Sequence, residues 1–158
     1  MIYLGLGSNI GDKLKFINSA EEKISKLYKT KVLRSSSVYK SEPWGIKTQE
    51  EFFNSVLEID TELKPEHLLA ELKKIEIVLG RKNREKWFKR EIDIDILFYD
   101  NIVLKNDFIN IPHPEIQNRK FVLVPLCELN PGFIHPVLND TLENLLKNSE
   151  DNSKVKKI

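Results

Sequence analysis

The sequence predicts a single α+β domain, and three observations support this interpretation. Residues 14–28 and 65–79 carry apolar side chains at the spacing of an amphipathic helix. Strand-length apolar or alternating runs surround these two segments, which gives the order β-α-β-β-α-β. No internal repeat or low-complexity linker divides the chain before residue 148. We therefore expect one domain over residues 1–147.

The first third of the chain supplies a strand, a helix and a second strand. Residues 2–6 are an apolar run that predicts a buried strand, and residues 7–12 are typical of a turn. The helical period then continues from residue 14 to residue 28, and residues 32–39 predict the next strand. The N-cap side chains that the turn offers to the helix are Ser8, Asn9 and Asp12.

The middle of the chain continues with a loop, a strand and a helix. Residues 40–50 contain a proline and a glycine and predict a loop, after which residues 52–59 alternate as in a strand. Pro65 lies near the first turn of the second helix, where its missing N–H group is not needed. Gly80 is placed to end that helix.

A strand, a hairpin and short helices complete the domain. A basic loop at residues 81–90 leads into a strand at residues 92–99. Asp100 and Asn101 begin a turn into residues 102–104, which we expect to form a hairpin. The remaining expected elements are an extended connector at residues 111–114, a helix at residues 122–129 and a short helix at residues 142–146.

This order of elements is the ferredoxin-like split-βαβ plan. It predicts an antiparallel sheet with helices packed on one face, plus an extra hairpin and C-terminal helices. The fold hosts unrelated functions, so it identifies none of them. Residues 148–158 are polar and lysine-rich, and we expect them to be a disordered tail.

Composition narrows the possible functions. Of the 158 residues, 25 are basic and 24 acidic, so the formal net charge of +1 provides no general attraction for nucleic acid. No apolar run is long enough to span a membrane, and the first residues lack the pattern of a signal peptide. Cys127 is the only cysteine and most simply serves packing. We expect a cytoplasmic monomer with no nucleic-acid or membrane partner.

The most informative segment alternates carboxylates with isoleucines from Glu91 to Ile96. In a strand, the isoleucines lie on one face and Glu91, Asp93 and Asp95 lie on the other. Two aspartates on one face repel each other unless a positive group lies between them. Carboxylate oxygens suit Mg²⁺, which is often bound by one or two carboxylates together with substrate phosphates. A solvated strand face is the alternative for this segment alone.

The basic loop that precedes this strand suggests a phosphate ligand. Residues 81–90 contain six basic side chains and one acidic side chain. Arginines bind phosphate through paired hydrogen bonds, and a metal-bound polyphosphate would bridge the loop and the acidic strand. Trp87 and Phe88 argue against a merely solvated loop, because large exposed aromatics usually cover something.

Two further clusters could contribute to the same site. His113 lies between two prolines and precedes Asn118 and Arg119, so it could donate to a phosphate oxygen. Phe52 and Phe53 with Asn54 could sandwich a flat heterocycle and recognise its edge. Structural roles remain the alternatives for each cluster alone. The glycines of the first turn do not form a Walker loop, because no Gly-Lys-Ser/Thr sequence follows.

Taken together, these segments resemble one family. LGLGSNIGDK, SSVYKSEPWG, FFNSV, IEIVLGR, REIDIDILFYD and IPHPEIQNRKFVLVPLCELNP occur in the order typical of 6-hydroxymethyl-7,8-dihydropterin pyrophosphokinases of the folate pathway. The resemblance covers the chain to about residue 145. It implies a ferredoxin-like catalytic domain that transfers pyrophosphate from ATP to the pterin hydroxymethyl group, with AMP as the other product.

The resemblance also implies roles for individual residues. Asp93 and Asp95 match the metal ligands, which would bind two Mg²⁺ ions, and they form the catalytic centre with Arg81 and Arg90. The positions matching the ATP site are Glu76, Arg81, Arg90, Ile96, His113 and Arg119. The positions matching the pterin site are Ser41, Trp44, Phe52, Asn54, Trp87 and Phe121.

One departure from the family pattern affects the loop. A Trp-Gly-Pro-Arg-Thr sequence usually precedes the acidic strand, whereas this chain has Trp-Phe-Lys-Arg-Glu at residues 87–91. We expect the loop at residues 81–90 to become ordered only when nucleotide and pterin are both bound, with ATP binding first. An RNA-binding module and a nucleotide-binding regulatory protein remain the alternative functions. The two aspartates argue against RNA, because they would repel a phosphate backbone.

Overall fold

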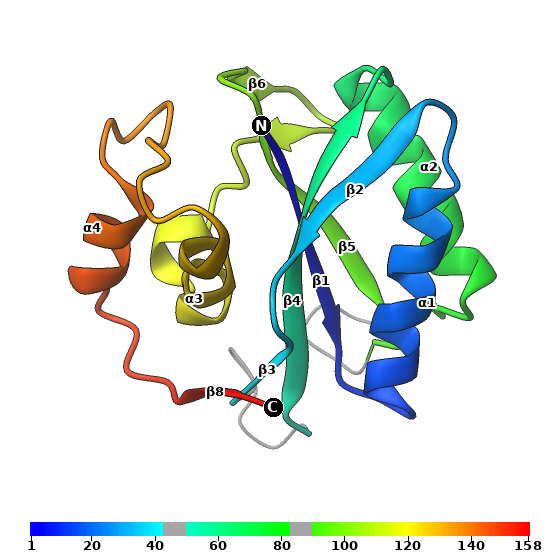
Figure 1. The fold of residues 1–158 in the computed structure, drawn as a ribbon, viewed down its shortest axis with the longest axis horizontal. Coiled ribbons are helices and arrows are strands. Elements are labelled where there is room, and N and C mark those ends of the chain that lie inside the picture. Colours follow the sequence, from blue (N-terminus) through cyan, green and yellow to red (C-terminus); the bar gives the residue numbers. More distant parts are fainter. Residues whose placement is uncertain (43–49, 83–89) are drawn as a thin grey trace.

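An antiparallel sheet forms the centre of the molecule, and its central strands are the ones the sequence predicts (Figure 1). The computed structural model describes residues 1–42, 50–82 and 90–158. A short 3₁₀ turn, Ile116–Asn118, precedes the third helix. The strands and helices are β1 (Ile2–Ser8), α1 (Lys13–Ser25), β2 (Thr30–Ser35), β3 (Tyr39–Ser41), β4 (Phe52–Thr61), α2 (Pro65–Val78), β5 (Asp93–Tyr99), β6 (Leu104–Lys105), β7 (Asn110–Ile111), α3 (Lys120–Leu129), α4 (Leu142–Lys147) and β8 (Val155–Lys157).

The strand order confirms the predicted topology. The main sheet runs β5-β1-β4-β3-β8, and β2 also pairs with β4. Every strand pair in this sheet is antiparallel. The first and last strands of the β-α-β-β-α-β unit, β1 and β5, therefore lie side by side with β4 on the other side of β1, as in a ferredoxin-like fold.

Helices cover both faces of the sheet: the two helices of the β-α-β-β-α-β unit pack on one face, as expected, and the appended C-terminal helices pack on the other. In Figure 1, α1 and α2 lie on one side of the sheet and α3 and α4 lie on the other. Two buried clusters correspond to these two faces, one containing Leu4 and Ile94 and the other containing Tyr3 and Leu123. Because β1 is apolar on both faces, each face requires a cover. The C-terminal helices α3 and α4 cover the second face.

A bulge in β5 modifies the predicted alternation. Ile92, Ile94 and Ile96 pack in the α1–α2 core, as the alternation predicts. Tyr3 pairs with Phe98 and the next residue of β1 pairs with Ile96, so Leu97 is an extra residue without a partner across β1. Leu97 and Phe98 therefore both join the core beneath α3. The regular alternation that places the two aspartates on one face therefore ends at this bulge.

The strand predicted at residues 32–39 is divided in two. Ser36 lies between β2 and β3 and binds Val56 twice: its backbone N–H donates to the Val56 carbonyl at 2.9 Å, and its hydroxyl accepts from the Val56 N–H at 2.8 Å. The side chain thus replaces one backbone partner, and the chain changes direction there. β3 continues beside β4 after this break.

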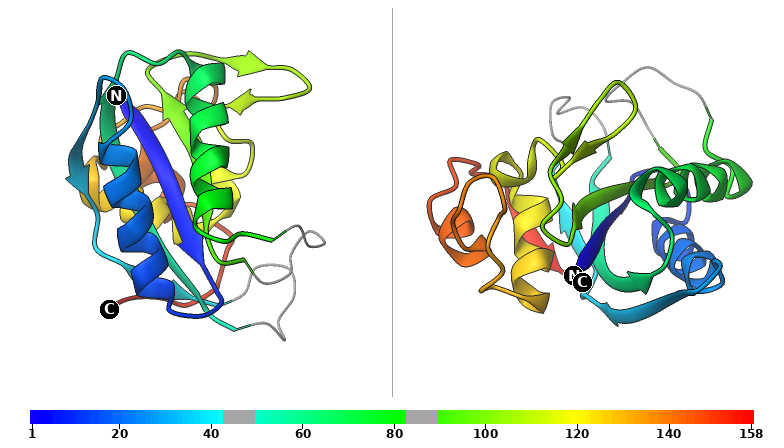
Figure 2. Two further views of the ribbon diagram at one scale, coloured as in Figure 1. Left: turned by 90° about the vertical axis from the view of Figure 1, so that its right-hand side faces the viewer. Right: turned by 90° about the horizontal axis from the view of Figure 1, so that it is seen from above.

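Two other expectations also differ from the structure. The turn after β5 leads to β6, but β6 pairs with β7 in a separate two-stranded sheet, as the left view in Figure 2 shows. The expected disordered tail is wrong for residues 155–157, which form β8 and pair with β3. A polar, lysine-rich composition suits an edge strand, where alternate side chains face solvent. In the described ranges, no helix is long and apolar enough to cross a membrane.

Candidate active site

A cavity of about 480 Å³ lies where the start of β5 meets the start of α3. β1 and β4 form its floor, and the connector before α3 forms a wall. The lining combines cationic, anionic and aromatic side chains with two glycines. The residues that line it are Gly5, Leu6, Gly7, Phe52, Asn54, Ser55, Val56, Lys73, Arg81, Arg90, Asp93, Asp95, Leu97, His113, Pro114, Glu115, Arg119, Phe121 and Val122.

Two arginines hold one aspartate from opposite sides. Arg81 Nη1 donates to Asp93 Oδ1 at 2.9 Å, and Arg90 Nη1 donates to Asp93 Oδ2 at 2.8 Å. Burial by itself would raise the pKa of Asp93, but the positive charges of Arg90, Lys73 and Arg81 outweigh burial and lower it. Asp93 is therefore ionised, and both guanidinium groups are held at the cavity wall.

Glu76 fixes this arrangement from behind. Glu76 Oε1 accepts from Arg81 Nη1 at 2.7 Å, and Glu76 Oε2 accepts from the Ile94 backbone N–H at 2.7 Å. Glu76 is 3% exposed. Lys73, one turn earlier on α2, binds Glu76 Oε2 at 3.2 Å and the Ile94 carbonyl at 3.3 Å. Helix α2 is thus attached to β5 at the residue between the two aspartates.

Asp95 lies on the same strand face as Asp93, but its pKa is shifted in the opposite direction. Burial, followed by the negative charge of Asp93, raises the pKa of Asp95 to about 7. A divalent cation at the two carboxylates would relieve this repulsion, so the pair fits a metal ion. Among the described residues, no group of three or more His, Cys, Asp and Glu could hold a metal ion. Further ligands would therefore have to come from a phosphate substrate and water.

His113 and Arg119 add two donors on the opposite wall. Burial, together with the positive charge of Arg119, lowers the pKa of His113 to about 4, so its imidazole is neutral at pH 7. His113 Nδ1 accepts from the Glu115 backbone N–H at 3.2 Å. The proton of the neutral ring must then be on Nε2, which can donate to an oxyanion. Burial lowers the pKa of Arg119, but a guanidinium stays charged at neutral pH.

Other residues of the lining are suited to a flat, polar ring. Phe52, Phe121 and Asn54 line the cavity, and the Arg119 guanidinium lies 5.8 Å from the centroid of the Phe121 ring. Asn54 is 6% exposed, and its Nδ2 donates to Ser41 Oγ at 2.9 Å. This hydrogen bond fixes the orientation of the amide, including its carbonyl oxygen. A Cβ atom at Gly7 would lie 2.9 Å from Asn54 Oδ1. Glycine at this position is therefore required for the observed side-chain position of Asn54.

The structure brings most of the predicted site residues together, but not all. Arg81, Arg90, Asp93, Asp95, His113, Arg119, Phe52, Asn54 and Phe121 line the cavity. Ser41 and Glu76 lie behind this wall and hold Asn54 and Arg81. The Ile96 side chain packs in the core on the opposite face of β5, and its assignment to the nucleotide stays a prediction. Trp44, Trp87 and residues 83–89 of the predicted closing loop lie outside the described residues.

Sequence reasoning missed Asn9, Gly7 and Lys73. Asn9 was a candidate helix cap, but Asp12 caps α1 by accepting from the Lys15 N–H at 3.2 Å. Asn9 instead binds the backbone of Arg90. The glycines near the first turn match no phosphate-loop pattern, and the need for glycine at position 7 comes from the nearby Asn54 side chain. Lys73 had one detectable signal, its helical i,i+3 spacing from Glu76.

The chain is similar in sequence to a described family and to named relatives. Residues 3–131 match the family described as 7,8-dihydro-6-hydroxymethylpterin-pyrophosphokinase. The 2-amino-4-hydroxy-6-hydroxymethyldihydropteridine pyrophosphokinase of Aquifex aeolicus is 43% identical over 92% of this chain and 93% of its own length. The enzyme of the same name from Haemophilus influenzae is 38% identical over 98% of this chain and 96% of its own.

Solved structures agree on the fold. A Plasmodium falciparum HPPK-DHPS chain, solved with pteroate, matches 92% of this chain with a TM-score of 0.75 and 18% sequence identity. A second HPPK-DHPS structure, in complex with substrates, gives a TM-score of 0.72 at 17% identity. This chain spans 41% and 42% of those two longer chains. At this level of identity, the match supports the ferredoxin-like architecture alone.

Proposed function

The chain belongs to the 7,8-dihydro-6-hydroxymethylpterin-pyrophosphokinase family, and we propose that the cavity between β5 and α3 is where it performs this reaction. The enzyme transfers pyrophosphate from ATP to the hydroxymethyl group of 6-hydroxymethyl-7,8-dihydropterin, for folate biosynthesis. AMP and the pterin diphosphate are the products.

The cationic end of the cavity is assigned to the triphosphate of ATP. Phosphoryl transfer depends mainly on positioning and on neutralising charge at the phosphate oxygens. Arg81 and Arg90 supply rigidly held guanidinium groups, and Arg119 supplies a third from the start of α3. His113 holds a proton at Nε2 and can donate it in a hydrogen bond without carrying a charge.

Asp93 and Asp95 are assigned to two Mg²⁺ ions. Their support is the shared strand face and the raised pKa of Asp95, which is caused first by burial and then by the negative charge of Asp93. When bound, Mg²⁺ neutralises phosphate charge and can lower the pKa of a hydroxyl group. Asp93 is bound by both arginines in this structure, so substrate phosphates must compete with Asp93 for Arg81 and Arg90.

The aromatic end of the cavity is assigned to the pterin. Phe52 and Phe121 provide apolar ring surfaces, and Asn54 provides an amide that can recognise the edge of the heterocycle. Its link to Ser41 fixes the amide orientation. Holding the ring here would direct the hydroxymethyl group toward the phosphates at the cationic end, which is the positioning that in-line transfer requires. Ser41 and Glu76 then act as supports for binding residues.

One observation carries this assignment: the paired aspartates and the Asp93–arginine contacts share a single cavity with Asn54 and two phenylalanines. The test is incubation with ATP, Mg²⁺ and the reduced pterin alcohol, followed by separation of the nucleotides. AMP identifies pyrophosphate transfer. ADP would identify an ordinary kinase, and unchanged ATP would favour binding without turnover.

Two further properties are proposed for the protein as a whole. The lone Cys127, half-buried against the α3–α4 core, suits a reducing cytoplasm. The near-zero net charge and the small-molecule cavity suit a monomer that has no nucleic-acid or membrane partner. Sedimentation of the purified chain tests the monomer directly.

A further inference from the structure

Residues 149–158, here called the terminal strap, contact both walls of the pterin end of the cavity. The strap leaves α4, passes the start of α3 and ends in β8 beside β3 (Figure 1). The start of α3 carries Arg119 and Phe121, which line the cavity. β3 carries Ser41, which holds Asn54. The strap therefore contacts both α3, which carries Phe121, and β3, which carries Ser41.

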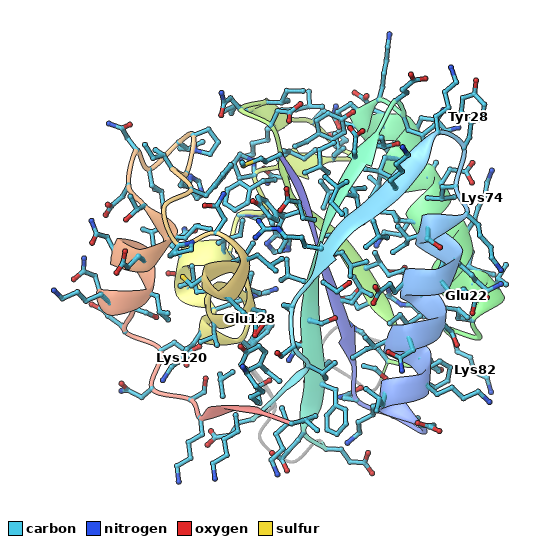
Figure 3. The ribbon with its side chains drawn as sticks, viewed as in Figure 1. Glu22, Tyr28, Lys74, Lys82, Lys120 and Glu128 are labelled. Carbon is cyan, nitrogen blue, oxygen red and sulfur yellow. The ribbon has the colours of Figure 1, made fainter. Side chains whose placement is uncertain are left out.

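The first contact is at the start of α3. Asp151 Oδ2 accepts a hydrogen bond from the Lys120 backbone N–H at 2.9 Å, across 31 positions of the chain. In Figure 3, Lys120 lies at the end of α3 that is nearest to the strap. Lys120 is the first residue of α3, and its N–H group has no partner within the helix. A carboxylate at this end also interacts favourably with the helix dipole.

The second contact is the pairing of β8 with β3. Val155 lies opposite Ser41, Lys156 opposite Lys40, and Lys157 opposite Tyr39. Ser41 is 1% exposed and accepts the hydrogen bond from Asn54 Nδ2. The strand that carries Ser41 therefore has β4 on one side and the strap on the other.

Asp151 joins these two contacts through its own carboxylate. While Oδ2 binds α3, Oδ1 accepts from the Ser153 backbone N–H at 2.9 Å and shapes the turn into β8. Burial opposes ionisation, but hydrogen bonds from Lys120 and Ser153 lower the pKa of Asp151 below its ordinary value. The side chain is therefore charged at neutral pH and uses both oxygens.

Glu128 provides a parallel link at the other end of α3. It accepts from the Tyr39 hydroxyl at 2.7 Å and from the Ser37 N–H at 2.6 Å, and Lys157 Nζ lies 3.6 Å from its Oε1. Figure 3 shows Glu128 on the side of α3 that faces the sheet. Helix α3, β3 and the strap thus form a closed set of contacts around the supports of the pterin end.

We propose that Asp151 is a positioning residue for pterin recognition, through which the terminal strap sets the distance between the start of α3 and β3. This inference rests on the proposed function, because it takes Phe121 and Asn54 as the pterin contacts. Without the Asp151 links, Phe121 and the Ser41–Asn54 pair keep their chemistry but lose their fixed separation. Pterin affinity then falls, while the chemical step in the fully bound complex changes little.

The experiment compares Asp151→Asn with Glu150→Gln, which neutralises the adjacent, exposed carboxylate. Asparagine has one acceptor oxygen in place of two, so it can keep only one of the two links. A second variant, Lys156→Pro, removes a backbone donor from the middle of β8 without touching Asp151. Each protein is assayed well below its thermal midpoint, and pterin binding is also measured by calorimetry with a non-hydrolysable ATP analogue.

We expect Asp151→Asn and Lys156→Pro to raise the pterin KM and Kd about three- to tenfold, as expected for loss of one helix-capping interaction, with kcat nearly unchanged. Glu150→Gln should match the parent. A lower thermal midpoint with unchanged pterin affinity in both variants would show a purely structural strap and overturn the inference. Absence of AMP formation by the parent protein would instead contradict the proposed function, and the calorimetry would still decide the role of the strap.

Discussion

Asn9 and Arg90 are joined by two hydrogen bonds between segments 81 positions apart. The Asn9 backbone N–H donates to the Arg90 carbonyl at 3.1 Å, and Asn9 Oδ1 accepts from the Arg90 backbone N–H at 2.6 Å. The Asn9 side chain is fully buried. The turn after β1 therefore holds the backbone of an arginine whose side chain binds Asp93.

Replacing Asn9 tests whether this backbone contact matters for the nucleotide. Asn9→Ala removes the acceptor for the Arg90 N–H and frees the arginine from its position. We expect kcat/KM for ATP to fall about tenfold, equivalent to about 1.4 kcal/mol, because one buried hydrogen bond is lost. Steady-state kinetics with ATP varied measures this. Asn101→Ala, in the exposed turn after β5, is the control, and equal kinetics for both variants would remove Asn9 from the site.

The two aspartates should be essential for turnover but not for folding. We expect Asp93→Asn and Asp95→Asn to lower kcat by several orders of magnitude, because each removes charge where metal and phosphates are proposed to meet. Circular dichroism should show unchanged folding. Asp60→Asn, an exposed substitution on β4, is the matched control. Near-normal turnover of either site variant at saturating Mg²⁺ would contradict the metal assignment.

Asn54 should affect one substrate selectively. Asn54→Ala leaves the Ser41 hydroxyl and the edge of the pterin without a partner, which costs about 1–3 kcal/mol. We expect pterin affinity to fall roughly ten- to a hundredfold, with ATP affinity almost unchanged. Separate calorimetric titrations of the two ligands measure this. Equal losses for both ligands would mean that Asn54 supports the whole cavity and does not recognise the pterin.

Gly7 should matter because of the side chain opposite it. A methyl group at Gly7 would lie 2.9 Å from Asn54 Oδ1, so Gly7→Ala must displace the amide that Ser41 holds. We expect a pterin KM at least several-fold higher than that of Gly132→Ala. Gly132 is a suitable control, because an added Cβ atom meets nothing within 4 Å there. Indistinguishable kinetics for the two variants would show that Asn54 can move without loss of function.

His113 should make the folded protein less stable as the pH falls. Its pKa is lowered to about 4 in the folded state, below the ordinary 6.5, because of burial and of Arg119. Below pH 6.5 the unfolded chain takes up a proton that the folded chain excludes, so the free energy of unfolding decreases until about pH 4.

The measurement is urea denaturation of the parent protein and of His113→Gln at pH 7 and pH 5. We expect the parent to lose about 1–2 kcal/mol more than the variant between these pH values. Asp95 has the opposite dependence, because its pKa is raised to about 7 and the folded state gains its proton first. The comparison with the variant separates the two effects, and an equal pH response of both proteins would contradict the lowered pKa.

Local patterns predicted the acidic strand well. Alternation from Glu91 to Ile96 correctly placed the isoleucines in the core, because one buried face determines the register of a strand. The assignment of Ile96 to the nucleotide came from the resemblance alone, and the side-chain position follows from the same alternation.

Long-range partners account for what the sequence did not predict. Asn9 is of a residue type that often caps helices, and only the folded chain shows that it binds the backbone of Arg90. The strap has the composition of a disordered tail. In the folded chain, however, Asp151 accepts a hydrogen bond from the Lys120 backbone N–H, and β8 pairs with β3. Such contacts depend on which distant segments meet, and this information is absent from local spacing. The predicted ordering of the loop at residues 81–90 by its two substrates stays a prediction.

The most direct test of the central claim is phosphorus NMR of the parent protein with Mg²⁺, the pterin alcohol and ATP. We expect the β- and γ-phosphorus atoms of ATP to appear together on the pterin as a diphosphate while AMP accumulates, and we expect Asp93→Asn to abolish both signals. Transfer of the γ-phosphorus alone, or diphosphate formation that persists in Asp93→Asn, would contradict this claim.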